Sequence, residues 1–249
     1  MSLIDALLGS LPQTAADWAV RDVRIGVFQT MVVVETPQGL RGGLASTPSG
    51  GQHLHGLTYD VRDSGYLTGC DPLQLAALAG SNSVLEAGVG LAAINALLEI
   101  DESRCAEINA ADILVERGAH KKMVVVGHFP FVPRLRQVAA SVEVLELNPR
   151  EGDLPADRAA DVIPQADVIA ITGTTLINHT FDDLIVLCPA EAYVVVLGGT
   201  APLSPLFFDL GVDAVSGTRI IDVEAALRAV GEGASFRQIP GRRLLTLFR

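Results

Sequence analysis

MVVVGHFP at residues 123–130 and VEVLELNP at residues 142–149 are two short apolar runs, and each ends in a cluster of polar and turn-forming residues. A stretch of helical character lies between them, and this alternation is typical of the opening of a βαβ unit. Ligands of such units bind beyond the carboxyl ends of the strands, which is where both clusters fall. The two runs therefore predict a parallel sheet and a binding site at its edge.

The second half of the chain repeats this alternation of strand and helix. Further apolar runs lie at residues 168–172, 193–197 and 214–216. Helical segments separate these runs, and a last helix is predicted over 223–230 with Asp222 as its cap. Consecutive βαβ units build a parallel sheet with flanking helices, so we expect a Rossmann-like sheet here.

The first part of the chain predicts a different arrangement. Three alternating stretches between residues 18 and 47 predict a small antiparallel meander, because short turns separate them. Two helices are predicted to follow, over 73–79 and 84–100. The predicted fold class is therefore α/β, with an α+β domain over 1–103 and a Rossmann-like domain over 104–249.

The composition bounds the class of protein. Hydrophobic residues make up 49% of the 249 residues, enough for a large buried core. The net charge of −11 argues against nonspecific nucleic-acid binding, which needs clustered Lys and Arg. The nearest basic cluster, Arg242-Arg243 with Arg249, is interpreted as a solvated tail. The sequence shows no apolar run that could span a membrane, no basic leader and no cysteine spacing typical of disulfides. A cytoplasmic protein without nucleic-acid or membrane partners fits best.

The first βα turn, Gly127-His128-Phe129-Pro130, lacks the glycine pattern of a dinucleotide site. Gly127 can form the tight turn, but Phe129 is bulky and Pro130 has no N–H to hold phosphate. A standard NAD or FAD site is therefore disfavoured. Glu146, about nineteen residues after Gly127, occupies the place of a ribose-binding acid. A carboxylate there can accept hydrogen bonds from a diol, although an edge acid or a helix cap explains it equally well.

Polar groups also follow the next two strands. Those after the strand at 168–172 include Thr172, Gly173, Thr174, Asn178 and Thr180. They can bind an anion or a polar ligand, or they can cap the following helix. Ligand binding is favoured because more polar groups gather here than one cap requires. The turn after the strand at 193–197 includes Pro202 and is expected to face the same crevice.

The sequence contains no C-x-x-C, H-E-x-x-H or G-x-S-x-G motif, so it does not support a zinc site or α/β-hydrolase chemistry. His128 and His179 follow predicted strand ends, and His53 and His55 lie in a glycine-rich loop. If that loop folds over the crevice, these imidazoles could converge with Glu146 on a transition metal. Scattered polar histidines are the alternative, and the sequence favours it.

Glu86 is an unusual acid on the mostly apolar helix predicted over 84–100. Asn82 lies four residues before it, so the two side chains share a face. Glu86 either interacts with the N-terminus of the helix or points into the cleft between the two domains, and the cleft is favoured.

Several motifs occur together as they do in a known family. In chain order they are Gly43–Thr47, Ser81–Ala87, Gly90–Ala96, Val126–Pro130, Glu146–Pro149, Ile171–Thr180, Ala201–Pro205 and Gly211-Val212. With them the sequence resembles the heavy-metal chelation family of unknown function, in which an enolase N-terminal-like domain precedes a Rossmann-like one. The resemblance implies a site in the cleft between the domains and a role in metal handling. The chain departs from the family pattern at His179, His53 and His55, which leaves the ligand open.

The predicted function is heavy-metal chelation or metal handling, with a small polar or metal-chelating ligand bound in the interdomain cleft. The residues expected to bind it are Asn82, Glu86, Gly127, His128, Phe129, Pro130, Glu146, Asn148, Thr172, Gly173, Thr174, Asn178, Thr180 and Pro202. His128 is the candidate metal ligand or acid–base group, and a transition metal is the candidate cofactor. No catalytic residue is assigned, and the sequence leaves open whether the chain is an enzyme or a homo-oligomer.

Two other interpretations stay open. One is an enzyme that uses a nucleotide or nucleoside-type cofactor in a non-classical Rossmann site, with Glu146 on the ribose. The other is a binding or assembly module whose crevice does no chemistry.

Overall fold

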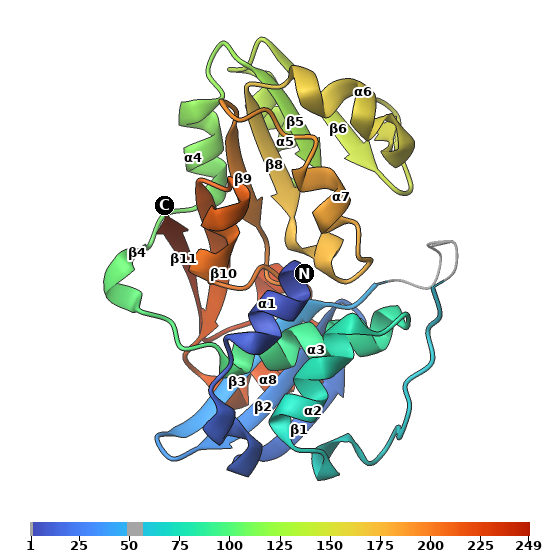
Figure 1. Ribbon diagram of the computed structural model, residues 1–249, viewed down its shortest axis with the longest axis vertical. Coiled ribbons are helices and arrows are strands. Elements are labelled where there is room, and N and C mark those ends of the chain that lie inside the picture. Colours follow the sequence, from blue (N-terminus) through green and yellow to red (C-terminus); the bar gives the residue numbers. More distant parts are fainter. Residues whose placement is uncertain (1, 49–56) are drawn as a thin grey trace.

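The computed structural model describes residues 2–48 and 57–249, and it has the predicted α/β class, with one small and one large sheet (Figure 1). The large sheet has eight strands in the order β4-β11-β10-β9-β8-β5-β6-β7. Their bounds are β4 Cys105–Ala106, β5 Lys122–Val126, β6 Ser141–Glu146, β7 Leu154–Pro155, β8 Val168–Thr172, β9 Tyr193–Leu197, β10 Ala214–Ile220 and β11 Arg242–Phe248.

The parallel part of the large sheet runs from β7 to β10. β5 is the first of these strands in the chain, with β6 and β7 on one side and β8, β9 and β10 on the other. This is the strand order of doubly wound sheets, in which the direction of winding reverses beside the first strand. The reversal lies between β5 and β8, and ligands of such sheets bind in the crevice beyond it.

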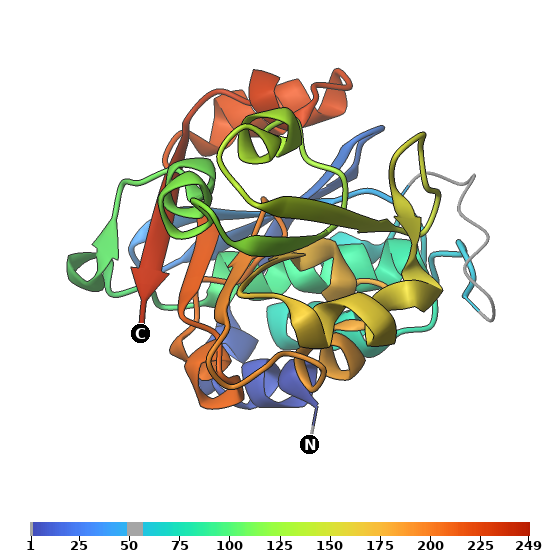
Figure 2. The same ribbon diagram turned by 90° about the horizontal axis from the view of Figure 1, so that it is seen from above.

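Helices cover both faces of the large sheet (Figure 2). Alternate residues of β9 face opposite ways, so Val195 packs with α4 and α5 while Val194 packs on the side of α6 and α7. This alternation explains why the central strands are almost continuously apolar. The helices are α4 Ala110–Arg117, α5 Val132–Arg136, α6 Ala159–Val162 and α7 Phe181–Ile185.

Some predicted helices are shorter or more tightly wound than expected. The helix predicted over 156–165 is α6 with a 3₁₀ turn on each side, Ala156–Arg158 and Ile163–Gln165. Pro164 explains the second turn, because proline removes a helical N–H and disfavours continuation of an α-helix. The remaining 3₁₀ segments are Gln13–Asp17, Leu67–Gly69, Leu78–Gly80, Glu102–Arg104, Gly173–Leu176, Pro205–Leu210 and Phe236–Gln238. None of the helices in residues 2–48 and 57–249 is both long and apolar enough for a membrane span.

The interpretation of the C-terminus as a solvated tail is wrong. Residues 242–248 form β11, which pairs antiparallel with β10 on one side and with β4 on the other. Leu245 and Leu247 are buried, while Arg243 forms ion pairs with two acids at the sheet surface, Glu102 and Glu107. The three consecutive buried residues Leu245, Thr246 and Leu247 stabilise the strand despite the adjacent arginines.

The small sheet is the predicted antiparallel meander, formed by β1 Ala19–Ile25, β2 Gln29–Thr36 and β3 Gly39–Ser46. Its helices are α1 Leu3–Gly9, α2 Pro72–Ala77 and α3 Val84–Leu97. Val32 and Val34 of β2 pack in the cluster that contains α3. Met31 and Val33 point to the other face and pack against α8, Val223–Gly231, from the far end of the chain. The small sheet is therefore buried on both faces, and one of the covering helices comes from the second half of the sequence.

Candidate functional site

A cavity of about 560 Å³ lies at the winding reversal of the large sheet and is called the switch-point pocket below. Gly127 follows β5, Glu146 ends β6 and Thr172 ends β8, so three strand ends contribute to its wall. The predicted site residues that line it are Gly127, His128, Phe129, Glu146, Thr172, Thr174, Asn178 and Thr180. These residues meet because parallel strands present their carboxyl ends at one edge of a sheet.

The small sheet also contributes to the pocket wall, through Ser46, Thr47 and Pro48. The buried Thr200, in the loop after β9, accepts a hydrogen bond from the backbone N–H of Ser46 at 2.9 Å. Asn95 of α3 donates to the carbonyl oxygens of Leu44 and Thr200, at 2.8 and 3.1 Å. These bonds fix the end of β3 against the large sheet and place its hydroxyls at the pocket.

His128 is held by a buried carboxylate. Its Nδ1 lies 2.9 Å from Oδ2 and 3.1 Å from Oδ1 of Asp153, whose side chain is 1% exposed. Because a carboxylate offers only acceptors, Nδ1 carries the proton, and Nε2 of the neutral imidazole is left with a free lone pair. This carboxylate–histidine arrangement is the one that orients metal-binding imidazoles in proteins.

Glu146 is bound to the backbone of the pocket rim. Its Oε1 accepts from the N–H of His128 at 2.6 Å, and its Oε2 accepts from the N–H of Leu147 at 3.1 Å. Gly127 makes the first bond geometrically possible, since its φ of +98° belongs to a region that favours glycine. A Cβ at this position would also lie 3.0 Å from Thr172 Cγ2. The strand end therefore turns sharply enough to bring the His128 amide onto Glu146.

Hydroxyl groups cover the β8 side of the pocket. Thr172 Oγ1 lies 3.0 Å from Thr174 Oγ1 and accepts from the Thr174 N–H at 3.3 Å. Thr180 Oγ1 donates to Asn178 Oδ1 at 2.7 Å, and it makes no capping bond to α7. The hydroxyls are therefore arranged around the cavity with partial mutual hydrogen bonding, which leaves donors and acceptors for a polar ligand.

Several predicted site residues lie elsewhere and do not line the pocket. Asn148 and Pro130 are exposed in loops beyond the strand ends. Gly173 is buried against the loop that carries Pro202, since a Cβ on it would lie 2.5 Å from the N of Ala201. Asn82 is exposed, and its carbonyl accepts from the Thr58 N–H at 3.0 Å.

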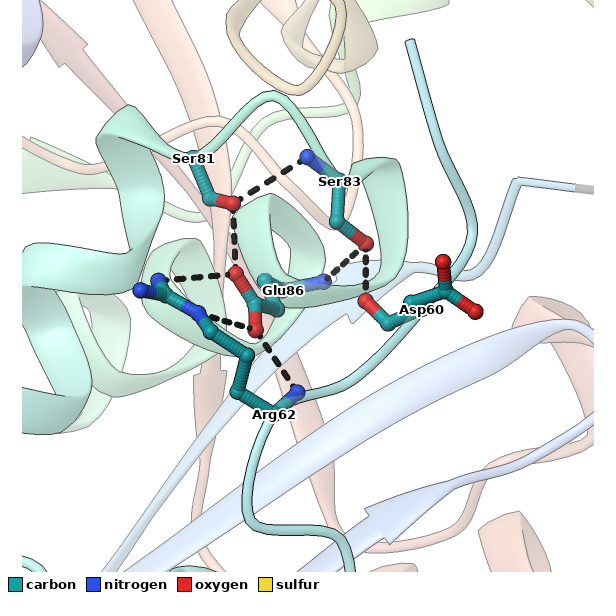
Figure 3. A network of polar contacts seen from close by, with 5 residues as sticks. All are labelled: Asp60, Arg62, Ser81, Ser83 and Glu86. Atoms are coloured by element: carbon teal, nitrogen blue, oxygen red, sulfur yellow. Dashed lines mark hydrogen bonds and ion pairs between the residues drawn. The ribbon is translucent and has the colours of Figure 1, made fainter.

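Glu86, expected to point into the cleft, lies away from the switch-point pocket in a polar network in which the glutamate is buried and the Arg62 side chain is 72% exposed (Figure 3). Its side chain is 3% exposed and accepts from Arg62 Nε at 2.9 Å, Arg62 Nη2 at 3.0 Å and the Arg62 backbone N–H at 2.8 Å. Ser81 Oγ donates a further bond at 2.5 Å. The bonds from Arg62, with that from Ser81, lower the pKa of Glu86 to about 2. Glu86 thus ties an irregular segment to the start of α3.

Convergence of the histidines on Glu146, the less favoured of the two interpretations, is not seen at the described positions. His179 Nε2 donates to the Ser81 carbonyl at 2.8 Å, and its ring lines a separate cavity of about 240 Å³. His53 and His55 lie outside the described residues. Across residues 2–48 and 57–249, no cluster of three or more His, Cys, Asp or Glu side chains could hold a metal ion.

Comparison with known proteins places the chain. Two family models, both described as "Putative heavy-metal chelation", match it over residues 9–98 and 109–248. The chain belongs to this family. The resemblance noted from the sequence is thereby confirmed, and the description of the heavy-metal chelation family names no particular metal or ligand.

The similarity to three relatives, one known by sequence and two by structure, extends over most or all of the chain. An uncharacterized protein of Methanocaldococcus jannaschii is 28% identical over 227 residues, which cover 88% of this chain and 86% of that protein. A family member of unknown function from Desulfitobacterium hafniense aligns with a TM-score of 0.81 at 23% identity, covering 99% of this chain and 97% of that one. Another from Pyrococcus horikoshii aligns with a TM-score of 0.83 at 22% identity over the full length of both chains. These likenesses show the fold.

In this member of the heavy-metal chelation family, several polar residues of the candidate site were not predicted from the sequence. Asp153 holds His128, and Ser46, Asp157 and Asp183 line the pocket. Ser46 belongs to the family motif Gly43–Thr47, but nothing in the sequence around it indicated a binding role. Asp153 had no sequence signal, because its partner lies on another loop and the spacing matches no motif.

Proposed function

We propose that the protein binds a small polar organic ligand in the switch-point pocket, and that this ligand brings the metal implied by the family description. His128 would supply a protein ligand through Nε2. The observation that carries the proposal is the His128–Asp153 pair at the pocket wall, because a buried carboxylate fixes the imidazole in its metal-binding tautomer.

The composition of the pocket explains why the metal would enter as a chelate. His128 and Glu146 face the same cavity, but residues 2–48 and 57–249 offer no third group placed with them to complete a metal site. A metal needs further donors, which a chelating ligand supplies. The volume of about 560 Å³ suits a small molecule. In this proposal the metal enters together with the ligand and is not a permanently bound cofactor of the protein.

Binding of the 1:1 complex of Ni²⁺ with 2,2′-bipyridine tests this proposal. Bipyridine supplies two donors and leaves nickel coordination positions that an imidazole can occupy. Calorimetry is expected to show that His128→Ala weakens binding of this complex at least about tenfold. Asp153→Asn is expected to weaken it by roughly tenfold as well, because the imidazole loses its orienting charge.

His120→Asn is the matched control, since His120 is exposed and far from the pocket lining. It also has a φ of +61°, a conformation that asparagine tolerates. This variant should bind the nickel complex as the wild type does. Absence of binding by the wild type, or equal affinity of wild type and His128→Ala, would contradict the proposal.

A second candidate function is supported by the position of Glu146 at the end of β6, beside the first parallel strand. This is where an acid binds the ribose in nucleotide-binding sheets. If a nucleoside-type cofactor binds here, adenosine at about 100 times its Kd should stabilise the protein by ~2.7 kcal/mol. The midpoint temperature of thermal unfolding should then rise by several degrees. 2′-Deoxyadenosine, which lacks one hydroxyl for Glu146, should give a clearly smaller rise, and equal shifts for the two would count against this role.

A further inference from the structure

We propose that Glu146 occupies, as a built-in anion, the position where related sheets bind phosphate, so that the pocket selects uncharged or cationic ligands and rejects phosphorylated ones. The inference rests on the proposed function, because it names the ligand class of the same pocket. It is carried by the hydrogen bonds of Glu146 and by the charges around the cavity.

The first βα turn of a doubly wound sheet normally offers backbone N–H groups to phosphate. In this protein the His128 N–H at that turn donates to Glu146 Oε1 at 2.6 Å. Pro130 and Pro133 have no N–H, and the Val132 N–H donates to the Phe129 carbonyl at 3.1 Å. The N–H groups of Gly127, His128 and Val132 are therefore committed before any ligand arrives.

Glu146 reaches this position from the neighbouring strand. Its second oxygen is held by the Leu147 N–H at 3.1 Å, so the carboxylate is fixed at both ends by backbone groups. Hydrogen bonds from backbone N–H to a carboxylate are stronger than bonds between neutral groups. A phosphate could reach the His128 amide only by displacing this carboxylate.

The charge of the pocket also disfavours phosphate. Three carboxylates line it, those of Glu146, Asp157 and Asp183. Within the described part of the chain, no lysine or arginine lines the cavity. A phosphate would therefore meet like charges without a compensating cation, whereas an amine, a hydroxyl or a metal-bound ligand would be attracted.

The apolar part of the pocket wall indicates the apolar part of the ligand. Apolar groups of Phe129, Leu184 and Leu187 face the cavity together with the hydroxyls of the β8 side. The ligand class is a molecule with an apolar or aromatic body that carries hydroxyl, amine or metal-bound groups and no phosphate. A cationic metal chelate belongs to this class.

Titration with inorganic phosphate, followed by amide NMR of the isotope-labelled protein, tests the inference. In the wild type, the amide signals of His128 and Leu147 should not respond to millimolar phosphate. In Glu146→Ala both amides lose their acceptor and a space opens beside them, so phosphate should shift both signals and bind at least about tenfold more tightly than in the wild type. Glu146→Gln keeps the packing but removes the charge. It replaces the alanine variant in this titration if that variant does not fold.

Asp183→Asn provides the comparison, because it removes an exposed carboxylate from the same wall without freeing a backbone amide. Its phosphate affinity should rise by no more than about threefold, because one exposed and screened charge is lost and no donor becomes available. The inference is overturned if phosphate shifts the His128 amide equally in wild type and Glu146→Ala. It is also overturned if the two Glu146 variants bind no phosphate, or if Asp183→Asn gains as much as they do. The nickel–bipyridine experiment uses no phosphate, so the two proposals can fail separately.

Discussion

Gly90→Ala is expected to lower the free energy of unfolding by about 3 kcal/mol, because α3 has no room for a side chain at this position. A Cβ on Gly90 would lie 1.9 Å from the N of Ala79 and 2.5 Å from the C of Leu78. Both are backbone atoms, which cannot rotate away as a side chain can. The helix would have to move from the 3₁₀ turn over Leu78–Gly80, and urea unfolding measures the loss.

Gly88→Ala, in the same helix, provides the control. A Cβ there would lie 3.5 Å from the Ser46 carbonyl oxygen, which is an ordinary contact. Alanine is a better helix former than glycine by about 1 kcal/mol, so this variant should be equal to the wild type or more stable. Similar losses for Gly88→Ala and Gly90→Ala would contradict the packing described for α3.

Arg62→Ala is expected to destabilise the protein by about 2–3 kcal/mol near neutral pH. The Glu86 carboxylate would stay buried at 3% exposure, with only Ser81 and the backbone N–H of residue 62 as partners. The Arg62 side chain is itself 72% exposed, but its partner carboxylate is buried, so removal of the arginine leaves that charge without its cation and costs more than losing an ion pair exposed on both sides. Arg21→Ala is the control, because Arg21 pairs with Glu35 at the surface, and it should lose less than about 1 kcal/mol.

The same network predicts how stability depends on pH. The pKa of Glu86 is about 2 in the folded protein, below its ordinary value of 4.5, because Arg62 and Ser81 donate to the ionised form. The stabilisation is present above pH 4.5 and is lost as the pH falls from about 4.5 to 2, amounting to ~3 kcal/mol over the whole range. Unfolding curves over this range should show a clearly smaller loss for Arg62→Ala. Equal losses in wild type and variant would contradict the assignment.

The sequence predicted which strand ends meet at the candidate site, because strand ends are visible in a sequence and parallel strands bring them together. Gly127, Glu146 and Thr172 follow three apolar runs, and all three line the pocket. The sequence could not predict Asp153, because its contact with His128 depends on the path of a loop. Pairings between loops are set by the whole fold and leave no local pattern.

Glu86 and β11 show a second limit of sequence reasoning. An acid on an apolar helix has to be satisfied, but its partner Arg62 lies in an irregular segment upstream that no periodicity connects to α3. For β11, the adjacent charges of Arg242 and Arg243 predicted exposure, although Leu245 and Leu247 after them are buried together with Thr246. The strong local signal suggested a tail, while burial of alternate leucines in the sheet determined the structure.

The position of α8 has a consequence for synthesis of the protein. Met31 and Val33 of β2 stay exposed on one face of the small sheet until α8, Val223–Gly231, is available to cover them. A growing chain folds from its N-terminus as residues leave the ribosome, so this sheet cannot complete its core until α8 has been made. The hydroxyls of Ser46 and Thr47, which belong to the same sheet end, then reach the pocket late. We therefore expect the nascent chain to depend on protection of this apolar face and to bind a ligand only after α8 has packed against the small sheet.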